Sequence, residues 1–382
     1  MIKLRRQGLM QDLPLLDTGG QSFRFAQWHA IAEQLQRIDM GIGGVIEMPE
    51  PVTNPESKDR YLIRNLMEEA ITSSQLEGAV TTRPIAKDMI RSGRAPRDNS
   101  EQMILNNYRT MQRIVNKKDR SLTPDLVFDI HRLITENTLD DPSASGRPRR
   151  RDERIRVEDM YGTVFHNPPH ADELPRRLEA MCDFANAKTP ERFIHPVLRA
   201  IILHFWLAYD HPFVDGNGRV ARALFYWSML RNGYWLCEFI SISQIIRKAP
   251  AKYYRAFLHT ETDENDLTYF ILHQLDVMHK AMDELHTYIT RESQRSRALR
   301  LRLQGLDLLN HRQCALMDHA LNHSEADYTI QSHQSSHGVV NQTARKDLLD
   351  LADRGLLTVR KVGRIYRFRP VPDLAERLTK LD

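Results

Sequence analysis

Cysteine and long apolar runs are scarce in this sequence. Only three of its 382 residues are cysteines, at Cys182, Cys237 and Cys314, and they form no Cys-x-x-Cys pair. This spacing excludes a zinc ribbon and a disulfide framework, and it is typical of a reducing compartment. No stretch approaches the roughly 18 apolar residues of a membrane span, and the N-terminal segment lacks the apolar part of a signal peptide. We therefore expect a cytoplasmic protein with no membrane partner.

Strong net charge and internal repeats are also missing. The formal charge is +4, which by itself favours neither nucleic acid nor a membrane as a partner. No period of about 20 to 50 residues recurs, which excludes solenoids and propellers. The chain is 41% hydrophobic and 27% charged, as expected for a globular protein of two or three domains.

Apolar residues recur at helical spacing through most of the chain, which predicts a mainly α fold. After a mixed region, 1–55, that ends in a proline-rich loop, a helix is expected over about 60–78, with Gly78 as its stop. The stretch 146–175 has short alternation and Pro-Pro, which favours an irregular hairpin. Further helices are predicted over 100–117, 123–138, 172–186, 193–210, 218–231 and 264–290, the last capped by Asp263 or Asn265, and 291–302 is expected to be a linker or solvated helix end.

Residues 305–382 have the pattern of a winged helix. Three helices are expected near 311–322, 329–335 and 343–353, followed by two β-rich runs that turn near Val362–Gly363. The segment holds 11 Lys and Arg against 10 Asp and Glu, a net of +1, which falls short of the basic footprint of a DNA-binding module. Protein contact or dimerisation is therefore as well supported as DNA binding, although five basic residues cluster there: Arg345, Lys346, Arg360, Lys361 and Arg364.

A possible metal pair in this segment is weaker still. His333 and His337 are four residues apart, which is a metal-ligand spacing, but no third ligand is evident. We interpret them as residues of a solvated loop.

The segment His211–Arg222, HPFVDGNGRVAR, carries the chemistry. Its proline and glycines predict a loop that turns into a helix, where backbone N–H groups converge on one spot. Arg219 and Arg222 lie three apart in the first helical turn, where the helix dipole disfavours positive charge. Two cations there favour a polyanion such as a phosphate chain. Asp215 could hold a hard divalent ion, and His211 could remove a proton near neutral pH.

A dinucleotide site is the main alternative for this loop. Residues 216–221 also satisfy G-x-G-x-x-G/A, and Glu238 follows about twenty residues later. The apolar run before the loop extends back to Val197, too long for a typical strand, and no alternating βαβ pattern surrounds it. The sequence context therefore excludes a Rossmann fold.

HPFVDGNGRVAR resembles the motif of the Fic family, HPFx[D/E]GNGRxxR, at every specified position. The resemblance extends over about residues 60–290. It implies a helical core with a small β-hairpin flap around Met160–His166 and transfer of AMP from ATP, with Mg²⁺, to a Ser, Thr or Tyr hydroxyl of a protein. By position, the resemblance makes His211 the general base and Asp215 the Mg²⁺ ligand.

The resemblance also assigns the nucleotide contacts. Phosphate binding would fall to Gly216, Asn217, Gly218, Arg219 and Arg222. Tyr253 and Tyr254 resemble the tyrosines that flank adenine, with simple packing as the alternative.

An inhibitory motif is a further point of resemblance. Ser73–Gly78, SSQLEG, is similar to the family's [S/T]xxxE[G/N] motif, placed before the core. Ser73 and Glu77 are four apart and share a helix face. The resemblance implies that Glu77 pairs with Arg222 at the γ-phosphate position and inhibits the enzyme.

These observations divide the chain into an N-terminal region, 1–95, a Fic core, 96–292, and a winged-helix module, 305–382. The leading function is a protein adenylyltransferase that inhibits itself through Glu77. The alternatives are removal of AMP from a modified protein and a nucleotide-sensing transcriptional regulator. The protein substrate, which could include the chain itself, and the oligomeric state stay open.

Overall fold

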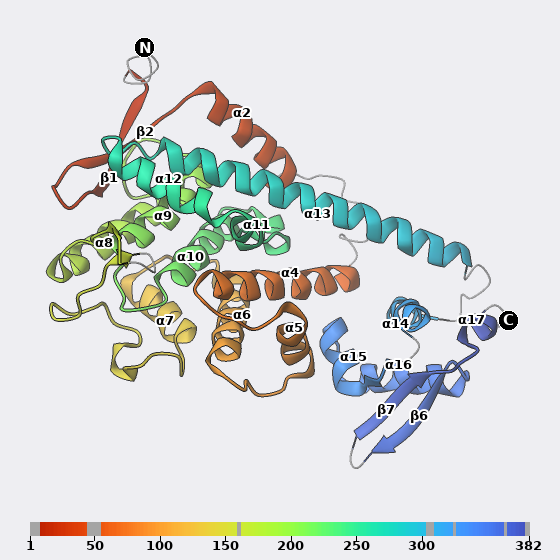
Figure 1. Ribbon diagram of the computed structural model, residues 1–382. Helices are drawn as coiled ribbons and strands as arrows, with labels where there is room; N and C mark the ends of the chain where they lie inside the picture. The colour runs from red at the N-terminus through yellow and green to blue at the C-terminus, as the bar shows by residue number, and fades with distance from the viewer. Residues whose placement is uncertain are drawn as a thin grey trace. The chain divides into compact units, whose positions relative to one another are not determined.

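The computed structural model describes residues 8–43, 55–158, 162–302, 309–323, 326–362 and 365–378. The chain divides into two compact units (Figure 1). The first comprises Met1–Ile46, Asn65–Ala86 and Ala95–Leu285, and the second comprises Glu47–Arg64, Lys87–Arg94 and His286–Asp382. The N-terminal region and the core that the sequence separates at residue 95 thus both contribute to the first unit.

The first unit is built almost entirely from helices. Three helices contribute residues to both units: α4 (Pro55–Leu76), α5 (Arg83–Ser92) and α13 (Thr268–Arg302). The other helices of the first unit are α2 (His29–Ile38), η1 (Asp39–Gly43), α6 (Asn99–Lys117), α7 (Pro124–Ile134), η2 (Pro142–Ala144), η3 (Ala171–Glu173), α8 (Leu174–Ala185), α9 (Pro196–Asp210), α10 (Asn217–Arg231), η4 (Trp235–Phe239), α11 (Ile242–Lys248) and α12 (Pro250–Thr262). Each helix predicted in this part of the chain is confirmed.

Helices α9 and α10 form the centre of this unit. Almost every side chain of both helices is buried, including Trp206 and Trp227. A helix that is apolar on all sides must be covered on all sides, and Figure 1 shows other helices around this pair. The loop between α9 and α10 is the predicted phosphate site, so it connects two deeply buried helices.

Several helix ends differ from the prediction. Helix α7 ends at Ile134 rather than at 138, because the chain turns at Asn137, which has a φ of 56°. Helix α13 begins at Thr268, where Asp266 rather than Asp263 or Asn265 accepts the Thr268 N–H. It continues to Arg302, so the arginine-rich stretch 291–302 is a helix end.

An N-terminal hairpin was missed by the sequence analysis. Strands β1 (Met10–Leu16) and β2 (Ser22–Ala26) pair in antiparallel fashion, and Asp17 closes the turn by accepting the Gly19 and Gln21 N–H groups. Leu13, Leu15, Phe23 and Phe25 are buried. Their alternation is visible in the sequence, but the two strands are short and separated by an ordinary polar turn.

The predicted irregular hairpin is present and small. Strand β3 (Val157–Glu158) pairs with β4 (Val164–His166) with a register shift between them. Met160, where the predicted flap begins, lies outside the described residues. Val164 and Phe165 are exposed, whereas His166 is buried and contacts Tyr209 O and Glu261.

The second unit contains the predicted three helices and hairpin. Strand β7 lies between β5 and β6, and the core of the unit includes Met317, Leu348, Leu351 and Phe368. The C-terminal elements are α14 (His311–Asn322), β5 (Tyr328–Thr329), α15 (Ile330–His337), α16 (Asn341–Asp353), β6 (Leu357–Val362), β7 (Ile365–Pro370) and α17 (Leu374–Leu378). The order of helices and hairpin is confirmed, and the winged-helix assignment itself stays a prediction.

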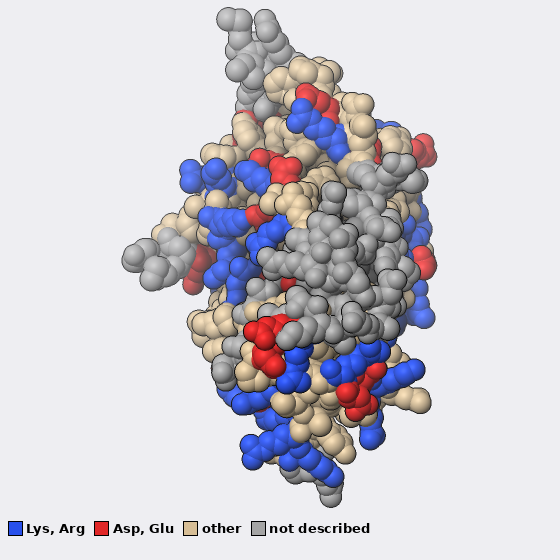
Figure 2. Space-filling model, turned by 90° about the vertical axis from the view of Figure 1, so that its right-hand side faces the viewer, with Lys and Arg blue, Asp and Glu red and all other residues tan. Residues whose placement is uncertain are grey.

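Basic side chains gather on the hairpin of the second unit. Figure 2 shows Lys and Arg at its lower end, the level at which Figure 1 draws β6 and β7. Arg360 and Lys361 are exposed there, whereas Arg367 and Arg369 pair with Asp327. Arg364, the remaining basic residue of the predicted cluster in this hairpin, lies outside the described residues. Two of the four described basic side chains of the hairpin therefore share a single carboxylate.

No helix among the described residues has both the length and the apolar character that crossing a membrane requires.

Candidate active site

The loop between α9 and α10 turns sharply at both ends. His211 adopts a left-handed conformation, with φ 44° and ψ 56°, and its N–H donates to Leu207 O as the C-cap of α9. Gly216 has φ 84°, a region that residues with a Cβ rarely adopt. A Cβ at this position would also lie 3.1 Å from Thr135 Cγ2. The loop therefore needs glycine at position 216 for both conformation and space.

Asn217 fixes the shape of the loop from inside. Its Oδ1 accepts the Phe213 N–H at 2.9 Å, and its Nδ2 donates to Phe213 O at 2.8 Å. Phe213 is fully buried and stacks on His131, with ring centroids 3.8 Å apart. The side chain of Asn217 is therefore occupied by the loop, and its predicted phosphate contact could come only from its backbone N–H or after rearrangement.

The first turn of α10 presents unpaired backbone donors. The N–H groups of Gly216, Asn217 and Gly218 have no hydrogen-bond acceptor among the described residues. A helix N-terminus carries a partial positive charge, and these groups lie at its start. This geometry is typical of an anion-binding site, and phosphate binding at the loop stays a prediction.

His211 is placed to act as a base. Its Nδ1 lies 3.2 Å from Ala208 O, which can only accept, so Nδ1 carries the proton and Nε2 keeps a free lone pair. Burial lowers the pKa of His211 to about 4, although the bond to Ala208 O acts in the opposite direction. The imidazole is consequently neutral near pH 7 and can accept a proton.

Arg219 departs from its predicted role. Its side chain is fully buried, donating from Nη1 to Ile134 O at 3.2 Å and from Nη2 to Asp215 Oδ2 at 2.8 Å. A side chain with no exposed surface does not present its charge to an outer phosphate. Successive turns of α10 pack against the end of α7, which places Arg219 inwards and makes it a support for Asp215.

Asp215 keeps an accessible carboxylate. Its side chain is 51% exposed, and Oδ1 has no hydrogen-bond partner among the described residues. The carboxylate thus lies beside the unpaired N–H groups with one oxygen available.

Arg222 and the predicted inhibitory residues do come together. Arg222 is almost completely buried and donates from Nε to Ser73 Oγ at 2.8 Å, and from Nη2 to Ser73 O at 3.0 Å and Glu77 Oε1 at 2.8 Å. Burial alone would lower the pKa of Arg222, but Glu77 raises it above its usual value. The guanidinium is therefore charged and held by α4.

The Glu77 carboxylate also touches the start of α10. A Cβ at Gly218 would lie 2.0 Å from Glu77 Oε1, so only glycine lets the carboxylate approach this closely. Glu77 itself is 28% exposed. An acidic side chain thus sits beside an unpaired helix N-terminus and a buried arginine, where an anion is favoured.

The two tyrosines differ from each other. Tyr253 is buried, lies with its hydroxyl 2.9 Å from His204 Nε2, and packs against Phe257 and Phe270. Its ring therefore belongs to the core rather than to an adenine pocket. Tyr254 is 53% exposed and is the only one of the pair with a face open to a ligand.

Sequence reasoning missed the residues that hold α4 in place. Glu69 is buried and accepts hydrogen bonds from Tyr226 Oη, Ser241 Oγ and the Ser243 N–H and hydroxyl. The sequence contains one indication of this network, because Glu69 is a charged residue among the regularly spaced apolar residues of 62–71. This network fixes the helix that presents Glu77.

Two further supports of the loop were also missed. Arg149 donates from Nε to His211 O at 2.9 Å and from its backbone N–H to Pro212 O at 2.7 Å. His131 lies 3.0 Å from Asp215 O. Both residues are distant in the sequence from HPFVDGNGR, so no local pattern connects them to it.

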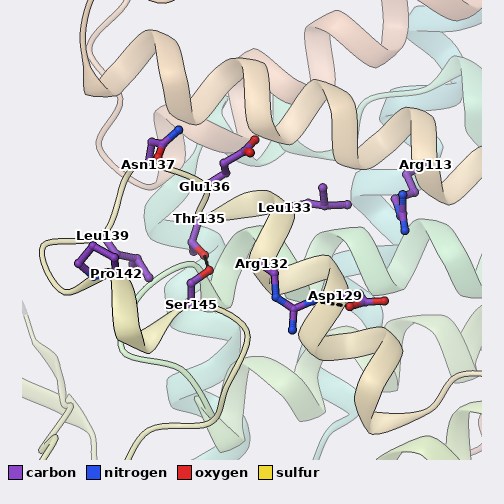
Figure 3. A pocket seen from close by; sticks show the side chains of 10 residues that line it. All are labelled: Arg113, Asp129, Arg132, Leu133, Thr135, Glu136, Asn137, Leu139, Pro142 and Ser145. Atoms are coloured by element: carbon purple, nitrogen blue, oxygen red, sulfur yellow. Dashed lines mark hydrogen bonds and ion pairs between the residues drawn. The ribbon is translucent and has the colours of Figure 1, made fainter.

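An open pocket of about 390 Å³ lies near α7, and none of the predicted site residues lines it (Figure 3). Thr135 bonds Ser145 across it, and Arg132 bonds Asp129. The pocket is lined by Arg113, Asp129, Arg132, Leu133, Thr135, Glu136, Asn137, Leu139, Pro142 and Ser145. Most of the predicted site residues lie instead in the α9–α10 loop and at the start of α10.

The fold and the site together show a helical protein with a neutral histidine beside a helix N-terminus that has unpaired N–H groups. Residues 121–229 match the family model described as "Fic/DOC family". The match begins before α7, ends two residues before the end of α10, and includes the whole of the loop.

Known relatives match this central part of the chain. The "Protein adenylyltransferase Fic" of Nematostella vectensis is 35% identical over 118 residues, 31% of this chain and 25% of that protein. The protein of the same name from Aedes aegypti is 30% identical over 179 residues, 47% of this chain and 32% of that protein. The chain thus matches a quarter to a third of the length of these relatives.

Solved structures share the fold over a longer stretch. A Fic family protein from Desulfovibrio desulfuricans has a TM-score of 0.58 at 19% identity, with 91% of this chain and 98% of that chain covered. A Fic domain containing signaling protein from Bacteroides thetaiotaomicron has a TM-score of 0.52 at 20% identity, with 68% and 94% covered. At this identity the likeness concerns the fold alone, and it confirms the mainly helical class.

Proposed function

We propose that the chain is a protein adenylyltransferase, which transfers AMP from ATP to a Ser, Thr or Tyr hydroxyl of a protein. The observation that carries this proposal is the α9–α10 loop, where unpaired N–H groups at a helix start adjoin a neutral histidine with a free Nε2. Relatives of the Fic domain named as adenylyltransferases support the choice of AMP as the transferred group.

The chemistry assigns one role to each part of the loop. The N–H groups of Gly216, Asn217 and Gly218 hold the α-phosphate and stabilise the charge that develops on it. The target hydroxyl oxygen attacks the α-phosphorus, and His211 Nε2 takes its proton. The bond from the α-phosphorus to the bridging oxygen breaks, and pyrophosphate leaves. Positioning and charge neutralisation supply most of the acceleration in such transfers.

The residues fit Mg²⁺ as the accompanying ion. Asp215 offers a hard carboxylate oxygen beside the phosphate site. The described residues form no group of three or more His, Cys, Asp or Glu side chains that could hold a metal alone. This suits Mg²⁺, which is commonly bound through one or two carboxylates together with substrate phosphates and water. When bound, it would neutralise phosphate charge.

Autoinhibition through Glu77 is the second part of the proposal. In this arrangement the carboxylate neutralises Arg222 and occupies space at the start of α10. A γ-phosphate needs the same guanidinium, so ATP must either displace Glu77 or bind with its α-phosphate out of line. One charge-assisted bond in a partly desolvated site corresponds to about 10- to 100-fold in rate.

The test of the function uses ATP labelled on its α-phosphate. We expect labelled protein to appear when the Glu77→Gly variant is incubated with cell lysate, and His211→Ala in the same background to lower transfer by at least about 100-fold. ATP binding, measured by calorimetry, should change little because His211 acts on the hydroxyl.

Two outcomes would contradict this proposal. Equal labelling with and without His211 would remove the base from the mechanism. Release of AMP from modified proteins, without labelling, would favour the reverse reaction instead.

A further inference from the structure

Four carbonyl groups of the α9–α10 loop accept hydrogen bonds from other residues. The mechanism proposed above gives no role to two of the donor residues, Arg149 and His131, and uses only the backbone N–H of the third, Asn217. The pairs are His211 O and Pro212 O with Arg149, Phe213 O with Asn217, and Asp215 O with His131. Of these, the Asp215 carbonyl is nearest to the proposed phosphate donors in sequence.

The two ring nitrogens of His131 have defined roles. The Gly146 N–H donates to Nδ1 at 2.9 Å, so Nδ1 carries no proton. Nε2 must then carry the proton of the neutral ring, and it donates to Asp215 O at 3.0 Å. His131 is fully buried, which leaves no water to exchange with either bond.

The bond to Asp215 O also orients the next N–H group. The carbonyl of Asp215 and the N–H of Gly216 belong to one planar trans peptide, so they point in opposite directions. Fixing the carbonyl towards α7 consequently fixes the Gly216 N–H away from α7. Converging N–H groups bind an anion well only when their peptide planes are held in this way.

Two more contacts make His131 specific for this loop. Its ring stacks on Phe213 with an angle of 5° between the planes. Its Cδ2 would lie 3.6 Å from a Cβ at Gly216, which is ordinary contact distance. One side chain on α7 therefore contacts the loop at Phe213 and Asp215 and lies next to Gly216.

We propose that His131 is a positioning residue for AMP transfer, which aims the Gly216 N–H at the α-phosphate through its Nε2–H bond to the Asp215 carbonyl. The proposal rests on the proposed function, since it assumes that this N–H binds the α-phosphate. His131 itself touches neither ATP nor the target hydroxyl.

Two conservative variants test the two hydrogen bonds of the His131 ring one at a time. In His131→Gln the amide nitrogen takes the place of Nε2 and can still donate to Asp215 O. In His131→Asn the amide oxygen takes the place of Nδ1 and can still accept from Gly146. His131→Leu removes both bonds, and Val127→Ala on α7 is the control for a buried change that makes no bond to the loop.

The first test is an NMR measurement that does not depend on enzyme activity. Labelling with ¹⁵N-glycine leaves 17 glycine amide positions, among them Gly146 and Gly216. We expect the Gly216 amide resonance to move less in His131→Gln than in His131→Asn and His131→Leu, and that of Gly146 to move less in His131→Asn than in the other two, since all three variants lose the aromatic ring. A Gly216 resonance that moves by the same amount in all three variants would overturn the proposed orientation.

Transfer of AMP is then compared in the Glu77→Gly background. We expect His131→Gln to stay within about threefold of its parent in kcat, and His131→Asn and His131→Leu to lose at least about tenfold in kcat, with a smaller change in KM for ATP. Equal rates for the Gln and Asn variants would show that His131 only stabilises the fold. If the Glu77→Gly parent itself transfers no AMP, the proposed function fails, whereas the glycine resonances still decide the orientation.

Discussion

The two units of the molecule each contain a buried arginine–carboxylate contact, and the contacts differ in which partner is buried. In the C-terminal unit, Asp347 is 4% exposed and Arg312 is 16% exposed. In the candidate site, Arg222 is 2% exposed and Glu77 is 28% exposed. The carboxylate is thus the enclosed partner in the Arg312–Asp347 pair and the accessible partner in the Arg222–Glu77 pair.

Their hydrogen bonds differ in the same way. Both oxygens of Asp347 are occupied, by Arg312, Asn310 and His333. Glu77 accepts one bond, from Arg222, and its Oε2 has no partner among the described residues. A saturated, enclosed carboxylate serves the fold, whereas a single-bonded, accessible one can be replaced by another anion. The contrast separates a structural ion pair from an exchangeable one.

The largest expected effect is on the stability of the C-terminal unit. Asp347→Ala leaves Arg312 and His333 without their acceptor, and breaking a buried pair costs about 3–5 kcal/mol. We expect faster hydrogen exchange throughout α14, α15 and α16, measured by mass spectrometry. Asp353→Ala, at an exposed position of the same helix, is the control and should change little. If Asp347→Ala lowers the free energy of unfolding by less than about 1 kcal/mol, the Arg312–Asp347 pair is not a structural ion pair and the contrast with Arg222–Glu77 fails.

Acid should also weaken the C-terminal unit. Burial would raise the pKa of Asp347, but bonds from Arg312, Asn310 and His333 outweigh it and hold the pKa below its usual 3.8. The side-chain bond from Arg369 likewise lowers the pKa of Asp327 to about 2. A depressed carboxyl pKa contributes stability above the unfolded value of 3.8 and loses it as the pH falls through the folded value.

This effect can be measured by hydrogen exchange between pH 5 and pH 2, corrected for the intrinsic rates. Protection of α14–α16 and β5–β7 should fall throughout this range, because burial lowers the pKa of His333 below its usual 6.5 and the two carboxylates add their own loss below about pH 4. Protection that stays constant to pH 2 would contradict the role given to these carboxylates.

The smallest effect concerns Ser73 in the candidate site. Ser73→Ala removes the hydroxyl that accepts from Arg222 Nε but keeps the Ser73 carbonyl bond to Nη2. A neutral hydrogen-bond acceptor is worth about 1 kcal/mol, so we expect AMP transfer to rise about two- to fivefold over wild type. Ser74→Ala, whose hydroxyl bonds Met103 O, is the matched control. An increase as large as that of Glu77→Gly would mean that the serine, not the carboxylate, restrains Arg222.

Most of the helices and the position of the loop could be predicted from local patterns in the sequence. The helices follow from apolar spacing, and the loop follows from an uninterrupted motif, so Glu77 and Arg222 could be placed together in advance through the resemblance. The inward orientation of Arg219 could not be predicted, because it depends on where the end of α7 packs against α10. Burial of Tyr253 depends in the same way on Phe257 and Phe270. Periodicity shows which side of a helix is apolar, but not which neighbour covers a polar residue.

The roles of His131, Arg149 and Glu69 could not be predicted from the sequence, because they too depend on how the helices pack. Each acts on a backbone or side-chain group far away in the chain, such as Asp215 O, which is 84 residues from His131. A single sequence contains no record of such pairs. These contacts emerge only when the helices are packed together.

The most direct test of the exchangeable pair is AMP transfer by wild type, Glu77→Gly, Arg222→Ala and the double variant, assayed on the same target protein. Glu77→Gly should raise the rate about 10- to 100-fold, because the arginine becomes available to the γ-phosphate. The double variant should be as slow as Arg222→Ala, since both effects involve one guanidinium and cannot add. The account is contradicted if Glu77→Gly is no faster than wild type, or if the double variant stays as fast as Glu77→Gly.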